Sequence, residues 1–154
     1  MHIRAAKSPD RTAILALMRP GDPNRLRLDP TRFLVAEADD RIVGIVQVKR
    51  HWDGTPELAS LVVDEAHRGQ GIGSALVRNL VQQHGNAHPA ETLYLFCLAQ
   101  LEGYYNRLGF HTAPRKQLPW SLAILHLLGN GLGRLLRLTG NARIQIIAMN
   151  HKSL

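Results

Sequence analysis

The 154-residue sequence has one cysteine, no long apolar run and no acidic residue near its C-terminus. A single cysteine, Cys97, excludes an internal disulfide and is typical of a protein from a reducing compartment. No stretch reaches the roughly 18 consecutive apolar residues that a membrane span needs. The opening residues, MHIRAAKSPDRT, also lack the apolar core of a signal peptide. We therefore expect a cytoplasmic protein without a transmembrane segment.

Acidic residues are absent after Glu102, although seven of the 19 lysine and arginine residues follow that position. The formal net charge of +7 therefore comes entirely from the C-terminal third. Such a segment can attract phosphates, anionic lipid or nucleic acid, but a solvated basic surface is the simpler interpretation. Nucleic acid is disfavoured because the cations are not interleaved with the aromatic residues that such sites use.

Metal-ligand patterns are also missing. The eight histidines are scattered, and no pair has metal-ligand spacing with a cysteine or carboxylate partner. Cys97 stands among Leu95, Phe96 and Leu98, so we interpret it as a core residue rather than a nucleophile. We expect no metal site.

What is present is an alternation of strand and helix patterns suited to one domain spanning residues 1–154. Apolar periodicity and turn residues predict an α/β (α+β) fold with helices on both faces of a sheet. The expected strands are 2–6, the two halves of a hairpin over 32–52, 57–63, 92–98, a strand from Phe110, and 143–150. The expected helices are 8–20, one from the glycine loop to about His84, and 99–108.

The segment HRGQGIGSAL (67–76) places three glycines between a strand and a helix. Backbone N–H groups at a helix N-terminus bind phosphate, and glycines let a ligand approach the backbone closely. A Walker loop is excluded because no Lys-Ser/Thr pair follows Gly71. A dinucleotide-binding loop is excluded because its third glycine is absent and a hairpin precedes this loop.

The stretch LVVDEAHRGQGIGSALV (61–77) resembles the acyl-coenzyme A signature of the GNAT superfamily of N-acetyltransferases. Arg68, Gly71 and Gly73 match its core pattern R/Q-x-x-G-x-G/A. A second block, YYNRLGF (104–110), is similar to the family's late signature. The resemblance covers about residues 2–113 and 143–150. It implies the GNAT fold, with a mixed sheet of about seven strands splayed at the cofactor.

The resemblance also implies acetyl-CoA as cosubstrate. In the family, loop amides hold the pyrophosphate, and the end of the preceding strand pairs with the pantetheine arm. Leu61 N–H is the candidate oxyanion donor to the thioester carbonyl. The implied cofactor-binding residues are Leu61, Val62, Val63, Arg68, Gly69, Gln70, Gly71, Ile72, Gly73 and Ser74.

Two residues match the family's catalytic positions. Glu57 stands where several members carry the general base, which removes a proton from the acceptor ammonium directly or through water. His51 and Asp53 are reserve candidates. Tyr105 matches the family tyrosine four residues before Gly109 and would protonate the leaving thiolate, whereas Tyr104 points about 100° away on a helix.

The sequence departs from the family pattern on the cofactor side. Many members have an asparagine seven residues before the tyrosine, but this chain has Leu98 there, and Leu101 replaces an expected alanine. Contacts with that side of pantetheine must therefore differ or depend on the backbone. A subset of the superfamily shares this departure, and its substrates vary.

An apolar insertion at about 114–142 precedes the last expected strand. Its core, LPWSLAILHLLGNGLGRLLRLTG (118–140), predicts two short helices around a glycine hinge. A helix that is apolar on nearly every face must be buried against something. It could be a lid on the acceptor pocket, a homodimer interface, or an interfacial membrane element. We favour the lid or the dimer, because the basic residues are few for a strong membrane anchor.

Together these features predict an enzyme that transfers an acetyl group from acetyl-CoA to a primary amine of a small molecule or peptide by direct attack. The alternative is a non-catalytic acyl-CoA binding or sensing module of the same fold. The sequence does not name the acceptor amine.

Overall fold

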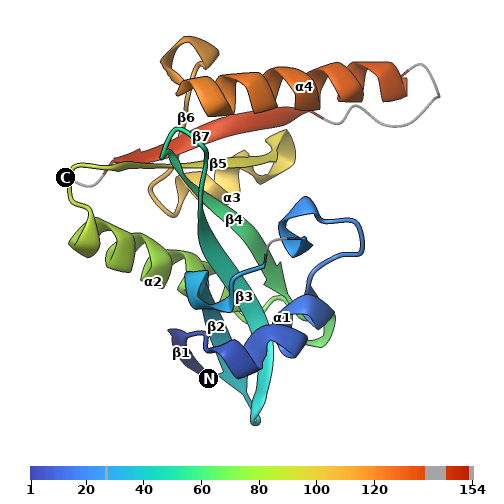
Figure 1. Ribbon diagram of the computed structural model, residues 1–154, viewed down its shortest axis with the longest axis vertical. Coiled ribbons are helices and arrows are strands. Elements are labelled where there is room, and N and C mark those ends of the chain that lie inside the picture. Colours follow the sequence, from blue (N-terminus) through green and yellow to red (C-terminus); the bar gives the residue numbers. More distant parts are fainter. Residues whose placement is uncertain (27, 138–144, 153–154) are drawn as a thin grey trace. The chain divides into compact units, whose positions relative to one another are not determined.

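The computed structural model describes residues 1–26, 28–137 and 145–152 (Figure 1). These residues form a mixed seven-stranded sheet with helices, as predicted. The chain divides into two compact units. The first comprises Met1–Lys49 and Leu58–His88, and the second comprises Arg50–Glu57 and Pro89–Leu154.

The first unit contains four strands in the order β1-β2-β3-β4, and β2 pairs antiparallel with both β1 and β3. Its hairpin turns at Asp39 and Asp40, which both have positive φ. Helix α1 is shorter than the predicted 8–20, because a 3-10 turn at Ser8–Asp10 precedes it. The elements are β1 (His2–Ala5), α1 (Arg11–Leu17), β2 (Phe33–Ala38), β3 (Arg41–Arg50), β4 (Pro56–Val63) and α2 (Ile72–Ala87).

Helices α1 and α2 cover opposite faces of the strands in the first unit. Side chains alternate along β2 and β3, so Val35 and Ile45 cluster with Ile14 of α1. On the other face, the hydrogen of Gly44 points toward Leu76 and Ile72 of α2. The expectation of helices on both faces is therefore met here, and α2 is held firmly on the sheet.

A test of this packing is Gly44→Ala. The added Cβ would lie 2.9 Å from Cδ1 of Leu76 and 3.2 Å from Cγ2 of Ile72, and both side chains are almost fully buried. We expect the free energy of unfolding to fall by about 1–3 kcal/mol, measured by urea denaturation. The matched control is Gly103→Ala in α3, where the nearest atom, of Arg107, is 3.9 Å away. That helical substitution should stabilise by about 0.5–1 kcal/mol, and equal effects of the two would contradict the packing.

The second unit contains three antiparallel strands in the order β5-β7-β6. Strand β7 pairs with β5 along its full length, from Thr92 opposite Lys152 to Leu98 opposite Ile146. The last strand therefore lies slightly later than the predicted 143–150, of which residues 143–144 lie outside the described residues. The elements are β5 (Thr92–Leu98), α3 (Glu102–Asn106), β6 (His111–Thr112), α4 (Trp120–Arg137) and β7 (Ile146–Lys152).

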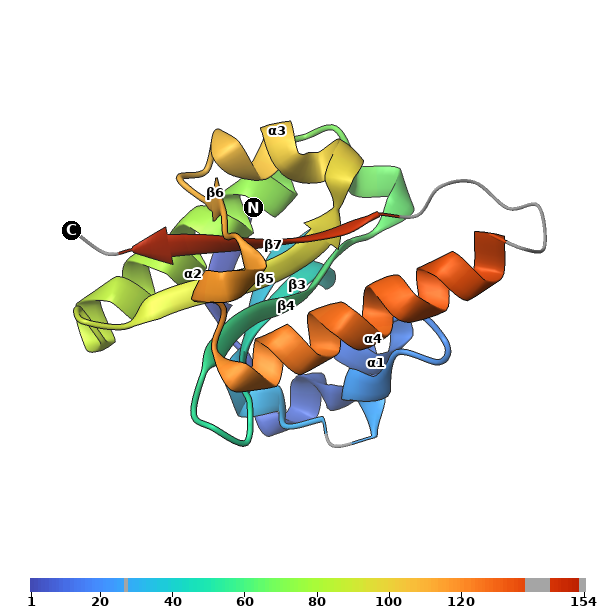
Figure 2. The ribbon, with the colours of Figure 1, turned by 90° about the horizontal axis from the view of Figure 1, so that it is seen from above.

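Helices α3 and α4 lie on opposite faces of this small sheet (Figure 2). On the α4 face, Leu122 packs with Ala148, Tyr94 and Phe96. On the α3 face, Sγ of Cys97 lies 3.7 Å from Sδ of Met149. Burial, with Glu102 nearby, raises the pKa of the Cys97 thiol to about 11. The interpretation of Cys97 as a core residue is confirmed.

The prediction of two short helices around a glycine hinge is wrong for the described part of the insertion. A single helix, α4, runs from Trp120 to Arg137 through three glycines. Each glycine costs about 1 kcal/mol in a helix interior. The first turns of α4 are nevertheless fixed, because Leu122 packs with Ala148 of β7 and Ser121 is held by Asp53, as described below. Residues 138–142 of the insertion lie outside the described residues.

Candidate active site

In the first unit, a hydrogen-bonded turn at Asp64–His67 joins the end of β4 to the glycine loop. Asp64 N–H donates to the Val43 carbonyl at 2.8 Å, which fixes the end of β4 beside β3. The Asp64 carboxylate then accepts Ala66 N–H at 3.1 Å and contacts His67 at 3.0 Å. The predicted residues Leu61–Val63 and Arg68–Ser74 are thus brought together as one continuous strand, turn and helix start.

Two glycines in this loop have left-handed backbone conformations beside open space. Gly69 has φ +78° and Gly71 has φ +79°. No heavy atom beyond their chain neighbours lies within 4 Å of the point where a Cβ would stand at either glycine. The left-handed conformation favours glycine, and the open space on the Cβ side leaves room for a ligand against the backbone.

Helix α2 opens directly onto this space. Gly71 is its N-cap, and the first helical hydrogen bond joins Ala75 N–H to the Gly71 carbonyl at 3.0 Å. The amides of Ile72 and Gly73 precede that bond and point out of the helix end, where the helix dipole adds positive charge. The arrangement can bind a phosphate or pyrophosphate.

Arg68 braces the loop. Its Nε donates to the Val63 carbonyl at 3.3 Å, and Nη1 lies 3.3 Å from a carboxylate oxygen of Glu65. The side chain is otherwise exposed, so its charge stands at the open side of the loop. The Arg68 side chain therefore links the end of β4 to Glu65 at the start of the loop.

A feature that the sequence did not indicate is the backbone of Ser60, which has φ +53° in the middle of β4. A left-handed residue inside a strand turns the backbone locally away from the regular strand conformation. Its Oγ accepts hydrogen bonds from Gln47 at 3.0 Å and from Asn24 at 3.2 Å. The one available signal was Gln47, a polar residue in an apolar run that is 6% exposed. Ser60 immediately precedes Leu61, the candidate oxyanion donor.

Glu57 and His51 form a close pair in the second unit, across the turn that joins β3 to β4. Nε2 of His51 lies 2.5 Å from a carboxylate oxygen of Glu57. The side chains are 5% and 13% exposed, so Glu57 does not extend freely into solvent. The contact is a hydrogen bond in which the histidine tautomer decides the donor and the acceptor. The sequence named both residues without naming their contact.

Asp53, the other reserve candidate, has a structural role at the same turn. Its carboxylate accepts Thr55 N–H at 3.0 Å, Ser121 N–H at 3.1 Å and the Ser121 hydroxyl at 2.9 Å. Burial opposes ionisation, but these hydrogen bonds outweigh it and hold the pKa of Asp53 below its usual range. Asp53 therefore anchors the first turn of α4 and is unsuited to accept a proton.

Tyr105 is buried on α3, also in the second unit. Its ring is 7% exposed and makes edge contacts with Tyr104 and with Phe110, at centroid distances of 5.0 and 6.0 Å. Burial, together with the neighbouring Tyr104 and Cys97, raises the pKa of the Tyr105 phenol above its ordinary value. The phenol is thus fully protonated at neutral pH and can serve as a proton donor.

Comparison with known proteins agrees with this geometry. A family model described as the acetyltransferase (GNAT) domain matches residues 29–112, which include β2, the glycine loop and Tyr105. The chain belongs to the GNAT acetyltransferase family.

One curated relative and two solved structures illustrate what the chain is similar to. An uncharacterized N-acetyltransferase of Methanocaldococcus jannaschii is 34% identical over 95 residues, which are 58% of each chain. The fold resembles N-acetylglutamate synthase from Neisseria gonorrhoeae, with a TM-score of 0.71, 21% identity, and coverage of 99% of this chain and 35% of that one. It also resembles the ribosomal-protein-S18-alanine N-acetyltransferase from Escherichia coli, with a TM-score of 0.68, 18% identity, and coverage of 99% and 93%. The chain spans less than two thirds of the curated GNAT relative's length.

The departure from the common GNAT pattern lies at the end of β5. Leu98 and Leu101, which replace the usual asparagine and alanine, are 39% and 40% exposed. The Ala99 N–H between them donates to the Gln145 carbonyl at 2.9 Å. This edge therefore presents apolar side chains where many GNAT members present an amide.

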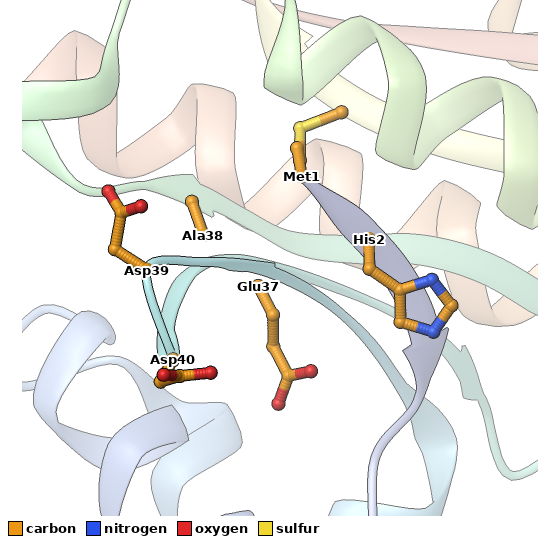
Figure 3. Close-up of a pocket in the computed structure, with 6 residues that line it drawn as sticks. All are labelled: Met1, His2, Glu37, Ala38, Asp39 and Asp40. Carbon is orange, nitrogen blue, oxygen red and sulfur yellow. The ribbon is translucent and has the colours of Figure 1, made fainter.

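A depression lies at the β2–β3 turn of the first unit. Figure 3 shows the carboxylates of Glu37 and Asp40 and the imidazole of His2 around it. None of the predicted site residues lines it, so we assign it no part in the chemistry. Its lining residues are Met1, His2, Glu37, Ala38, Asp39 and Asp40.

Proposed function

We propose that this chain is an acetyl-CoA dependent N-acetyltransferase. The observation that carries the proposal is the glycine loop. Gly69 and Gly71 leave open space against their backbone, beside the amino end of α2. A pyrophosphate fits such a loop, since orphan amides and the helix dipole both favour an anion. The residues that would hold coenzyme A are Leu61–Val63 along pantetheine and Arg68–Ser74 around the pyrophosphate.

The His51–Glu57 pair is the proposed proton acceptor. An alkyl ammonium has a pKa near 10.4. A base must therefore remove its proton before the nitrogen can attack the thioester. We assign this step to Glu57, directly or through water, with His51 orienting its carboxylate. If His51 is neutral and donates from Nε2, its Nδ1 is a second candidate proton acceptor. Separate substitution of Glu57 and of His51 distinguishes these two candidates.

The remaining steps use one backbone group and one side chain. The amine nitrogen attacks the thioester carbonyl, and Leu61 N–H is the proposed donor to the developing oxyanion. The C–S bond then breaks, the acetyl group stays on nitrogen, and the thiolate leaves with the electron pair. Tyr105 donates its proton to that sulfur, and its raised pKa keeps the phenol protonated at neutral pH until that step. The resulting phenolate regains a proton, through water, from the cationic nitrogen, which thereby becomes the neutral amide.

Tyr105→Phe tests the acid role. Loss of the hydroxyl should lower kcat roughly 10- to 100-fold, because the thiolate would leave without an internal proton donor. The dissociation constant for coenzyme A should change less than about twofold, because the ring and its packing remain. The measurements are steady-state kinetics and calorimetric titration with coenzyme A. Tyr104→Phe is the matched control, and equal rates for the two variants would remove Tyr105 from the mechanism.

The enzyme and the non-catalytic module are distinguished by one assay. Thiol release from acetyl-CoA is followed across a panel of primary amines that includes small molecules and peptide N-termini. Amine-dependent release supports the enzyme. Tight coenzyme A binding without turnover on any amine would establish the binding or sensing module instead.

For the acceptor we propose only a chemical class. The similar solved enzymes are named for different acceptors, glutamate in one and an alanine of a ribosomal protein in the other. We therefore propose a small-molecule or peptide amine without naming it. A single cytoplasmic domain stays a prediction, and the homodimer expected through residues 118–140 is the alternative to the surface contact proposed below.

A further inference from the structure

Helix α4 presents an apolar side to solvent. Its first turns bury Ser121 and Leu122, each 1% exposed. Around the rest of its described turns the helix exposes five large apolar residues, which are Trp120, Ile124, Leu125, Leu127 and Leu128. Four of them follow the helical spacing i, i+4, i+7 and i+8. These four are Trp120, Ile124, Leu127 and Leu128, at 76%, 42%, 51% and 63% exposure. We call this set the α4 surface, and its exposure is unusual for a helix facing water.

The second tryptophan of the chain stands beside this surface. Trp52 is 75% exposed and immediately precedes Asp53, whose carboxylate binds Ser121, the residue after Trp120. The two hydrogen bonds therefore bring both tryptophans of the sequence to the same end of α4. Exposed tryptophan is characteristic of the boundary between lipid and water, where its ring is apolar and its N–H stays hydrated.

The charges nearest the α4 surface are mostly basic, with the Asp53 carboxylate at the first turn as the exception. Arg115 and Lys116 are exposed just before the helix, and no acidic residue follows Glu102 in the sequence. A second copy of the chain docked face to face on α4 would bring these cations against their own copies. An anionic lipid surface has the complementary charge, and each nearby lysine or arginine adds about 1 kcal/mol of attraction.

We propose that the α4 surface docks on an anionic lipid bilayer, with α4 lying in the interface. Among the described residues, no helix combines the length and apolarity needed to cross a bilayer, so the contact is peripheral. The sequence interpretation ranked this use of the insertion below a lid or dimer because cations are few. The structure changes that ranking, because the apolar side of α4 supplies contact area that does not depend on the cations. The proposal does not depend on the proposed function.

The two tryptophans make the test direct, since all tryptophan fluorescence comes from the proposed contact. Vesicles of phosphatidylcholine with phosphatidylglycerol should shift the emission of the full-length protein to the blue and protect it from a soluble quencher. Pure phosphatidylcholine vesicles should bind more weakly, and added salt should weaken the binding to anionic vesicles. Trp52→Phe and Trp120→Phe assign the signal to each ring.

Leu128→Glu tests the surface itself. Replacing a leucine that would enter the bilayer with a charged residue should lower vesicle partitioning at least tenfold, which corresponds to about 1.4 kcal/mol. The matched control, Leu26→Glu, alters a leucine that is 88% exposed in the first unit and should bind as the wild type does. Equal binding by both variants, or no anionic preference, would overturn the proposal. A concentration-dependent dimer in light scattering, lost in Leu128→Glu alone, would overturn it in favour of a second copy.

Discussion

Replacing Gly71 with valine should weaken coenzyme A binding by at least about a hundredfold while the core stays folded. Gly71 has φ +79°, a conformation that a β-branched residue does not adopt without strain. The new side chain would also fill the open space beside the loop, where no atom beyond the chain neighbours now lies within 4 Å. Two lost amide–phosphate hydrogen bonds, at about 1.5–3 kcal/mol each, account for the expected loss.

The control for this variant is Gly21→Val. Gly21 has φ +85° and equally open surroundings, but it lies in the loop after α1, outside the proposed cradle. Both variants should lose a similar 1–2 kcal/mol or so of stability from the left-handed residue. Only Gly71→Val should lose coenzyme A in a calorimetric titration. Wild-type affinity in Gly71→Val would exclude the loop as the pyrophosphate site and would remove the main support for the proposed function.

Replacing Glu57 with glutamine should lower kcat by about 10²–10⁴-fold at neutral pH. Glutamine keeps the shape of the side chain and can still accept a hydrogen bond from His51, but it cannot take a proton. The affinity for coenzyme A should be unchanged, because the proposed cradle consists of other residues. Steady-state kinetics with a competent primary amine and a titration with coenzyme A provide the two measurements.

The pH dependence of this variant gives a second, independent readout. Without a base, Glu57→Gln can use only the fraction of acceptor that is already a free amine. That fraction rises about tenfold per pH unit below the amine pKa near 10.4. The deficit relative to wild type should therefore shrink as the pH rises. A constant deficit across that range would mean that Glu57 does not act as the base.

The activity of His51→Gln shows which residue of the His51–Glu57 pair is the base and which one orients it. If Glu57 is the base and His51 orients it, His51→Gln should lose much less activity than Glu57→Gln. The reverse order would assign the base to Nδ1 of His51, with Glu57 holding the ring. Asp53 is not part of this comparison, because its carboxylate is committed to Ser121 at the start of α4.

The donor side of the site could be predicted because its determinants are consecutive in the chain. Three glycines between a strand and an apolar helix leave few backbone conformations, and the left-handed Gly69 and Gly71 with α2 starting at Ile72 agree with that expectation. Tyr105 followed from the same kind of local pattern, with Phe110 packing against its ring. Local conformation depends on neighbouring residues, so sequence alone is informative there.

Other features depended on contacts between distant residues. Nothing in the run ELASLVV indicates that Ser60 is left-handed, because that conformation is held by side chains of Gln47 and Asn24. The insertion was misjudged for the same reason. Its glycines predict a break, whereas α4 is continuous, and its first turn is fixed by Asp53, 68 residues away from Ser121.

The sequence by itself determined the family, the glycine loop and the candidate residues Glu57 and Tyr105. Only the tertiary structure decided that Glu57 is buried against His51, that Asp53 anchors a helix, and that α4 turns an apolar side to solvent. The physical reason is that backbone preference is encoded within a few consecutive residues. Side-chain pairing and exposure arise only when strand register and helix packing bring distant residues together.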